Sequence, residues 1–175
     1  TRRSSDLASV RWSAAMASGH GQLAETLAQH AASERTPKAP MPDRDAIFSP
    51  CRRYRYSLWR RWGDGDYAMF FGLNPSTADE TADDPTIRRC VAFAKAWGYG
   101  ALCMTNLFAY RATNPDDMLS QADPIGPLND RHIRESADRA GIVVAAWGSH
   151  GSHMGRGRCV REMLPRLHIL RLTKG

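Results

Sequence analysis

An unbroken apolar run from Tyr67 to Phe71 passes through Gly72 into the polar segment Asn74-Pro75-Ser76-Thr77, and it constrains the fold more than any other stretch. A strand that is covered on both faces loses the alternation of apolar and polar residues and becomes continuously apolar. In an open parallel sheet, the loop that follows such a strand lies where ligands bind. The run therefore predicts a central strand that delivers a polar loop to a binding edge.

Segments of helical and strand character alternate after this run. Asp84-Pro85 is a strong helix start, because Asp is a good N-cap and Pro fits the first helical position. The pattern predicts a helix over 85–97, a strand over 101–106, a helix over 126–139, a strand over 141–147, a helix over 157–164 and a strand over 167–172. Such alternation is typical of parallel sheets with right-handed crossovers. We therefore expect an α/β fold, a three-layer sandwich on a four-stranded parallel sheet.

An N-terminal hairpin is expected to extend this sheet. The residues from 53 to 62 alternate arginines with aromatic side chains, and Gly63-Asp64-Gly65-Asp66 is a turn sequence that leads into the central strand. We expect the 53–72 segment to form two antiparallel strands. Interleaved arginines and aromatic rings suit phosphate contacts and base stacking, but they equally suit an edge strand that charge protects from aggregation.

The chain divides by composition near residue 45. Residues 1–45 are rich in Ala, Ser and charge, and Pro37, Pro40 and Pro42 mark a linker. We predict a flexible or loosely docked N-terminal arm over 1–45 and an α/β domain over 46–175.

Bulk properties bound the class of protein. The chain has 175 residues, 42% of them hydrophobic, which is enough for one buried core, and its net charge of +6 permits a polyanionic partner without requiring one. Four widely spaced cysteines without a Cys-x-x-Cys pair argue against a zinc ribbon or a disulfide framework and favour a cytoplasmic setting. No apolar run approaches the ~20 residues of a membrane span, and we expect a monomer that does not enter membranes.

Polar residues from separate segments are expected to meet, because loops that follow parallel strands emerge at one edge of the sheet. A carboxamide offers two donors and an acceptor, so Asn74 and Asn106 could read an amide-like heterocycle or hold a water. Alternatively, both satisfy loop backbone groups, as most loop asparagines do. The expected site comprises Asn74, Ser76 and Thr77, then Asn106, Tyr110 and Arg111, and finally Ser149, His150 and His153.

Several chemistries are disfavoured. The chain has no Gly-x-Ser-x-Gly elbow after the central strand, no evident Cys–His pair and no Gly-rich phosphate-binding loop of the known spacings. The acidic run from Asp79 to Asp84 could hold Mg²⁺, but capping of the following helix explains it more simply. His150 and His153 alone are too few for a metal site. We expect no metal and no cofactor.

Four ordered segments carry a family resemblance. Gly72-Leu73-Asn74-Pro75 resembles the first motif of the uracil-DNA glycosylase superfamily, a loop that positions the hydrolytic water. The segment from Leu102 to Arg111 is similar to that superfamily's second strand, whose terminal Asn reads the flipped base. Val144 to His150 resembles its Trp-Gly-Ser strand end, and Leu167 to Leu172 occupies the place of the strand before its His-Pro motif.

More closely, the Asn-Pro-Ser-Thr-Ala-Asp loop, Asp84-Pro85-Thr86 and the segment Thr105 to Arg111 resemble the bacterial and phage family called domain of unknown function 1643. That resemblance covers residues 46–175. Because the chain stops at Gly175, where the superfamily continues into the His-Pro loop, we expect the domain to be truncated at its C-terminal end. If Gly175 is instead the true end, the catalytic His is missing, and activity would be crippled or taken over by His150 or His153.

The superfamily resemblance implies N-glycosidic hydrolysis of a possibly modified base in DNA. In that reading Asn74 holds the attacking water, Asn106 reads the base, and Phe108, Tyr110 or Trp59 stacks on it. Ser76, Arg111 and Arg156 would contact phosphate. Two alternatives stay open, namely an inactive module that binds nucleic acid or modified bases and a hydrolase of free nucleotides or nucleosides.

Overall fold

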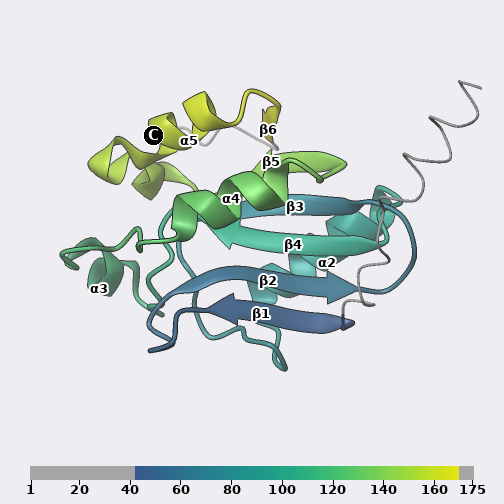
Figure 1. Ribbon diagram of the computed structural model, residues 1–175, viewed down its shortest axis with the longest axis horizontal. Helices are drawn as coiled ribbons and strands as arrows, with labels where there is room; N and C mark the ends of the chain where they lie inside the picture. The colour runs from purple at the N-terminus through teal and green to yellow at the C-terminus, as the bar shows by residue number, and fades with distance from the viewer. Residues whose placement is uncertain (1–41, 170–175) are drawn as a thin grey trace, which may run out of the picture. The chain divides into compact units, whose positions relative to one another are not determined.

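The computed structural model describes residues 42–169, in which six strands form one mixed sheet (Figure 1). Residues 1–41 of the expected arm and residues 170–172 of the expected last strand lie outside the described residues. The strand order is β1-β2-β4-β3-β5-β6. The strands are β1 (Arg44–Phe48), β2 (Arg55–Arg61), β3 (Tyr67–Gly72), β4 (Ala101–Asn106), β5 (Ile142–Ala145) and β6 (Leu167–Ile169).

The central strand has parallel neighbours on both edges. Strand β3 pairs with β4 and with β5, and β5 pairs with β6, all in parallel. Strand β2 runs antiparallel to both β1 and β4. The fold is therefore mixed α/β, with antiparallel strands at one side of the sheet.

The expected hairpin between β2 and β3 is wrong, because β4 lies between the two strands. Their connection crosses the amino end of β4, where the backbone N–H groups of Trp62 and Gly63 donate to Gly100 O over 3.0 and 3.1 Å. A Cβ atom at residue 100 would lie 2.2 Å from Asp64 O, so only glycine fits there. The tight turn sequence at 63–66 therefore makes a crossing over a neighbouring strand instead of a hairpin.

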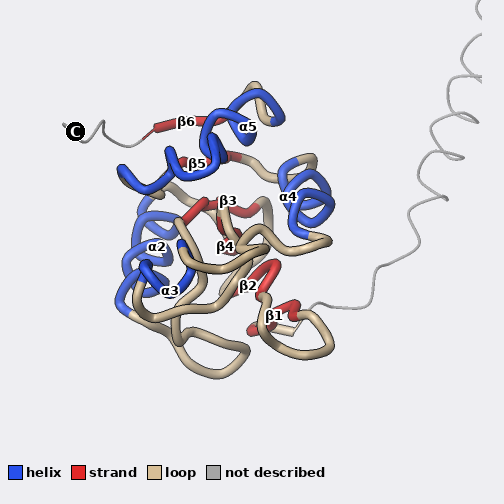
Figure 2. Tube along the Cα trace, turned by 90° about the vertical axis from the view of Figure 1, so that its left-hand side faces the viewer, coloured by secondary structure: helices blue, strands red, loops and turns tan. Residues whose placement is uncertain are grey.

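Helices cover both faces of the sheet (Figure 2). Helix α2 (Pro85–Ala96) packs on one face through Ile87, Cys90 and Ala94. On the other face, Ile133 of α4 (Asn129–Ala137) and Val160 of α5 (Arg156–Met163) join a second core cluster. Two short elements precede these helices, α3 (Pro115–Leu119) before α4 and the 3₁₀ segment η1 (Ser149–Gly155) before α5.

Strand β2 contains an irregularity that decides which side chains face α2. Ile47 pairs with Ser57 but the next residue, Phe48, pairs with Arg55, so Tyr56 is an extra residue in β2. Such a bulge interrupts the alternation of side chains. Arg55 consequently shares a face with Leu58, while the Tyr56 ring stacks on His132 of α4 at 4.8 Å.

Local signals in the sequence are confirmed where they are strongest. Strands β3 and β4 have the expected bounds, and α2 begins as predicted, with Asp84 accepting a hydrogen bond from Ile87 N at 2.8 Å. Strand β1, helix α3 and segment η1 were not predicted. Among the helices of residues 42–169, none combines the length and apolar character that a membrane crossing requires.

Candidate functional site

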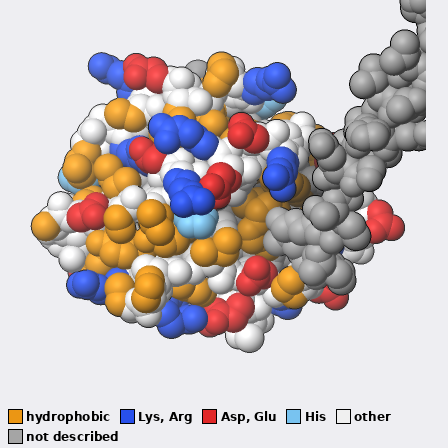
Figure 3. Space-filling model, in the orientation of Figure 1, with side chains coloured by type: hydrophobic (Ala, Val, Ile, Leu, Met, Phe, Trp, Pro, Cys, Tyr) orange, Lys and Arg blue, Asp and Glu red, His pale blue; other side chains and the backbone are white. Residues whose placement is uncertain are grey.

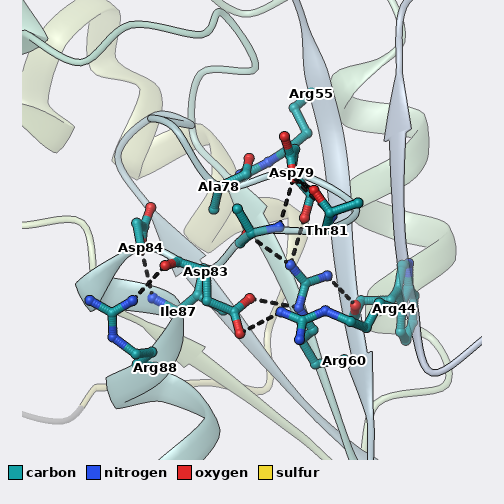
Figure 4. Close-up of polar contacts among 12 residues, drawn as sticks. Arg44, Arg55, Arg60, Ala78, Asp79, Thr81, Asp83, Asp84, Ile87 and Arg88 are labelled. Carbon is teal, nitrogen blue, oxygen red and sulfur yellow. Dashed lines mark hydrogen bonds and ion pairs between the residues drawn. The ribbon is translucent and has the colours of Figure 1, made fainter.

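Buried arginines of β2 hold the loop that follows the central strand (Figure 4). Arg55 donates from Nη1 to Ala78 O over 2.7 Å. Arg60 donates to the carbonyls of Asp79 and Ala82 and pairs through Nε with Asp83 Oδ1 at 2.7 Å. We call residues 78–84 the clamped loop. Its backbone carbonyls accept hydrogen bonds from side chains of the sheet. These bonds also fix the position of the preceding residues 74–77.

The acidic residues of the clamped loop are engaged within the protein. Asp79 Oδ1 accepts hydrogen bonds from Thr81 N, Thr81 Oγ1 and Ala82 N, and these lower the pKa of Asp79 to about 2. Asp83 pairs with Arg44 and Arg60, and Asp84 caps α2. Between residues 42 and 169, no group of three or more His, Cys, Asp or Glu side chains is arranged to hold a metal ion.

The direction of β2 brings its first residues to the edge where β4 ends. Because β2 is antiparallel to β4, its amino end lies beside the carboxyl end of β4. Arg111 N donates to Arg53 O over 2.9 Å, and Tyr54 forms an isolated antiparallel bridge with Tyr110. Two segments that are about 60 positions apart in the sequence, 52–54 and 110–111, therefore meet.

A cavity of about 340 Å³ opens at this meeting point, and we call it the arginine pocket. No carboxylate belongs to its lining, so its three guanidinium groups create a positive field that favours an anion. Four of its residues were expected in the site from the sequence. The lining is Arg52, Arg53, Ser76, Thr77, Tyr110, Arg111, Ala112 and Thr113.

The guanidinium groups of the pocket are only partly engaged. Arg52 pairs with Glu80 at 3.0 Å, and its Cζ lies 4.0 Å from the centre of the Phe48 ring. Arg111 also lies over Phe48 and donates from Nη1 to Arg52 O, but its Nε is buried without a partner in the described chain. Donors that are preorganised and unsatisfied suit an incoming oxyanion.

Asn74 supports one wall of the pocket. Its Nδ2 donates to Pro75 O at 3.1 Å and to Ala112 O at 2.8 Å, and Ala112 lines the pocket. Both amide protons are therefore committed to backbone carbonyls. The Oδ1 atom is left as an acceptor, which is the group that a water would need.

Asn106 does not line the pocket and forms a buried polar pair with Arg55. Its side-chain Oδ1 accepts from Arg55 Nη2 at 3.3 Å, and the residue is 3% exposed. The Asn106 side chain faces Gly72, where a Cβ atom would lie 2.6 Å from Asn106 Nδ2. Arg55 has no carboxylate partner in the described residues, and burial lowers its pKa to about 10.

Two residues that were expected to contact the ligand belong to the core instead. Phe108 is fully buried, so its ring is covered by protein and is not available for stacking on a base. Arg156 is 4% exposed, donates from Nε to Leu107 O at 2.9 Å and pairs with Asp130, so its guanidinium does not face a phosphate. The hydrogen bond from Arg156 to Leu107 O connects α5 to the loop after β4.

The third expected group lies apart from the pocket. Ser149 and His150 are exposed in η1, and His153 packs against Phe108 with ring centres 5.6 Å apart. None of the three lines the arginine pocket. The common carboxyl edge of β3, β4 and β5 is therefore real, but side chains from only the first two strand ends converge with the start of β2.

Sequence reasoning left Arg52 and Arg53 of the pocket out of the site, and it gave no role to Cys51, which precedes them. Cys51 is exposed, and its thiol lies 3.4 Å from Ser49 Oγ. That hydrogen bond and the neighbouring Arg53 lower the pKa of Cys51 to about 7. The sequence indicated these arginines through the run of arginines and tyrosines from 52 to 56. That run was consistent both with phosphate contacts and with an edge strand, so it did not decide between them.

Comparisons with known proteins give one match. The family model described as "Protein of unknown function (DUF1643)" matches residues 55–175, which is more than half of the chain. Searches of curated proteins and of solved structures found no match. The matched range contains most of the arginine pocket and excludes Arg52 and Arg53.

Proposed function

Because the chain belongs to the DUF1643 family, whose description names no activity, we propose its function from the site: it binds a nucleotide unit of DNA through the arginine pocket and hydrolyses the N-glycosidic bond of that nucleotide. The observation that carries the proposal is the composition of the pocket. Three arginines, three serine or threonine hydroxyl groups and a tyrosine surround one cavity without a carboxylate.

The binding half of the proposal follows from charge and geometry. Arginine forks and hydroxyl groups are the usual donors to phosphate oxygens. Tyr110, at the rim of the same cavity, offers a ring face for a base. Its phenol is held against Tyr54, with ring centres 5.9 Å apart. A phosphate and the adjoining base could thus be held by one pocket.

The chemical half assigns the water to Asn74. In N-glycosidic hydrolysis, the water oxygen bonds to C1′ of the sugar while the C1′–N bond breaks, and the base leaves with the electron pair and takes up the remaining proton of the water. An amide oxygen orients a water but is a weak base. The Asn74 amide, with its NH₂ group fixed by two carbonyls, fits this orienting role.

The proposal takes the domain to be uracil-DNA-glycosylase-like, a three-layer sandwich whose parallel part is β4-β3-β5-β6. Asn106 is buried and accepts a hydrogen bond from Arg55, so in this proposal it positions the end of β4 and does not contact the base. His150, which lies in η1, does not line the arginine pocket, so in this proposal the departing base takes its proton from the attacking water.

A test uses oligonucleotides that carry uracil, hydroxymethylated or glycosylated bases, with alkali-labile strand breaks as the readout. We expect breaks with one of these bases, loss of breaks in Asn74→Ala, and weaker binding in Arg111→Gln. Affinity should fall with salt as phosphate contacts require.

A second candidate function is a binding module without catalysis, which the distance in the fold between η1 and the pocket favours. Tight binding of the modified oligonucleotides without any base release would overturn hydrolysis and support this module. Turnover of free nucleosides with little dependence on salt would instead indicate a nucleotide or nucleoside hydrolase.

A further inference from the structure

Helix α2 presents an outer face that is both basic and aromatic. The helix contains Arg88, Arg89 and Lys95 and no acidic residue. Phe93 and the C-cap residue Trp97 are each 39% exposed, although rings of this size are usually covered. Helix α4, on the opposite face, carries Asp130 and Glu135 beside its arginines, and Figure 3 shows basic, acidic and apolar side chains interspersed there.

The exposed rings form an ordered stack that begins in the core. Trp97 lies between Phe70 and Phe93, with ring centres 5.7 and 5.6 Å away and interplanar angles of 11° and 23°. Phe70 is fully buried in β3, so it fixes the inner end of the stack. The outer rings are consequently held in place by packing before any ligand arrives.

A second cavity, of about 250 Å³, adjoins this stack, and we call it the α2 pocket. Two aromatic rings and a cysteine supply apolar walls, and Thr86 and Arg89 supply polar donors. The two pockets are close in sequence, because Ser76 and Thr77 line the arginine pocket and Pro85 and Thr86 line this one. The lining is Phe70, Pro85, Thr86, Arg89, Cys90, Phe93 and Ala146.

We propose that the α2 pocket is a second nucleotide site, in which single-stranded nucleic acid places one base against Phe93 and the adjoining phosphate against Arg89. Helix α2 contains three basic residues and no acid, and the acids that precede it are engaged within the protein, Asp83 by Arg44 and Arg60 and Asp84 as the N-cap, so the charge of α2 favours a polyanion. Stacked rings beside arginines are the means by which single strands are held independently of sequence. The choice of nucleic acid over other anionic aromatic ligands rests on the proposed function.

The loop between β3 and α2 connects the two pockets in the sequence, with residues 76 and 77 at one and residues 85 and 86 at the other. We place one nucleotide of a single strand in each pocket, and the acids between them, Asp79, Glu80 and Asp83, are held by hydrogen bonds or ion pairs within the protein. The arginine pocket then holds the nucleotide on which the reaction occurs, and the α2 pocket holds a flanking one. A strand of several nucleotides should therefore bind more tightly than a mononucleotide.

The test measures binding of a fluorescein-labelled eight-nucleotide oligothymidylate and of thymidine monophosphate to the same variants. Phe93→Leu keeps apolar volume but removes the aromatic face, and Arg89→Gln removes the charge. We expect each to weaken oligonucleotide binding about tenfold, so that the oligonucleotide loses its advantage over thymidine monophosphate. Arg158→Gln, an exposed arginine of α5, is the charge-matched control and should have no effect.

The outcomes separate this inference from the proposed function. Loss of oligonucleotide binding in Phe93→Leu and Arg89→Gln with no loss in Arg53→Gln would keep the α2 pocket and overturn the arginine pocket. Unchanged oligonucleotide affinity in both α2 variants, with native circular dichroism and unfolding, overturns the α2 pocket. Concentration-dependent self-association that Phe93→Leu abolishes, at unchanged oligonucleotide affinity, overturns it in favour of a second copy of the chain.

Discussion

Two groups of arginines lie within nine positions of one another at β2, and the protein uses them in opposite ways. Arg55 and Arg60 are 2% and 4% exposed and hold the carbonyls of the clamped loop. Arg52 and Arg53 are exposed and line a cavity. The first group is needed for structure, and the second is available to a ligand. The difference arises from backbone geometry, because the residue type is the same.

The largest expected effect concerns the structural group. Replacing Arg60 with Ala removes the donor to Asp79 O and Ala82 O and one partner of Asp83. We expect the free energy of unfolding to fall by about 3 kcal/mol, as for other buried ion pairs that lose one member. Urea unfolding followed by circular dichroism measures it.

Arg61→Ala is the matched control, since Arg61 is the next residue of β2 and is only half-buried. Its effect should stay within about 0.5 kcal/mol, as at most surface sites. Equal losses of unfolding free energy in Arg60→Ala and Arg61→Ala would show that the contacts of Arg60 with the clamped loop do not stabilise the fold.

The buried pair of Arg55 and Asn106 should be disrupted by Gly72→Ala. The new methyl group would lie 2.6 Å from Asn106 Nδ2 and displace the amide from Arg55. We expect a loss of about 2 kcal/mol in unfolding free energy, typical of overpacking in a core. Gly63→Ala, where the nearest atom is 3.9 Å away, is the control.

A double variant sharpens this prediction. If the clash with the Asn106 amide is the cause, then adding Asn106→Ala to Gly72→Ala should cost less than the two single losses together. Simple additivity of the two losses would contradict the proposed contact.

Arg53→Gln should show the opposite pattern from Arg60→Ala. Its side chain is exposed, so the unfolding free energy should change by less than about 0.5 kcal/mol, while the dissociation constant for thymidine monophosphate should rise about tenfold, as expected for loss of a charge-assisted hydrogen bond. Isothermal titration calorimetry and urea unfolding of the same preparation test both halves. A stability loss without a binding loss would move Arg53 into the structural group.

The smallest expected effect is a shift in the pKa of the Cys51 thiol. Because the thiolate is the reactive form, alkylation of Cys51 should reach half its maximal rate near pH 7, where its pKa lies. Burial raises the pKa of Cys90 to about 11 and of Cys103 to about 12, so both should stay unmodified at that pH. Mass spectrometry of iodoacetamide-treated protein gives the rates.

The sign of the shift reports on the pocket. Arg53 lowers the pKa of Cys51, so Arg53→Gln should move the alkylation profile to higher pH, and phosphate bound in the arginine pocket should do the same. An alkylation profile that does not respond to either change would show that the Arg53 charge is not felt at Cys51.

The sequence predicted those parts of the fold that local chemistry determines. The continuous apolar run fixed β3, and Asp84-Pro85 fixed the start of α2. The same kind of signal, Asn114-Pro115, begins α3 and was overlooked, although Asn114 Oδ1 accepts from Asp116 N there. Pairing of β2 with β4 was not predictable in the same way, because it depends on contacts between distant segments.

The site followed the same rule. Ser76, Thr77, Tyr110 and Arg111 were predicted, because residues after parallel strands share an edge. The burial of Phe108 and Arg156 depends on how η1, α4 and α5 pack on the loop after β4, and no local pattern encodes that. The arginines at 52 and 53 were visible, but their role depends on which neighbour β2 selects.

The extra residue Tyr56 changes which face of the sheet the preceding side chains of β2 occupy. It places Arg55 and Arg60, five positions apart, on one face of the sheet, whereas strict alternation would send them to opposite faces. Deleting Tyr56 would therefore restore strict alternation with Arg55 still opposite Phe48 and on the face of Arg60, and it would remove the ring that stacks on His132. The residue count of this strand carries information that its composition does not.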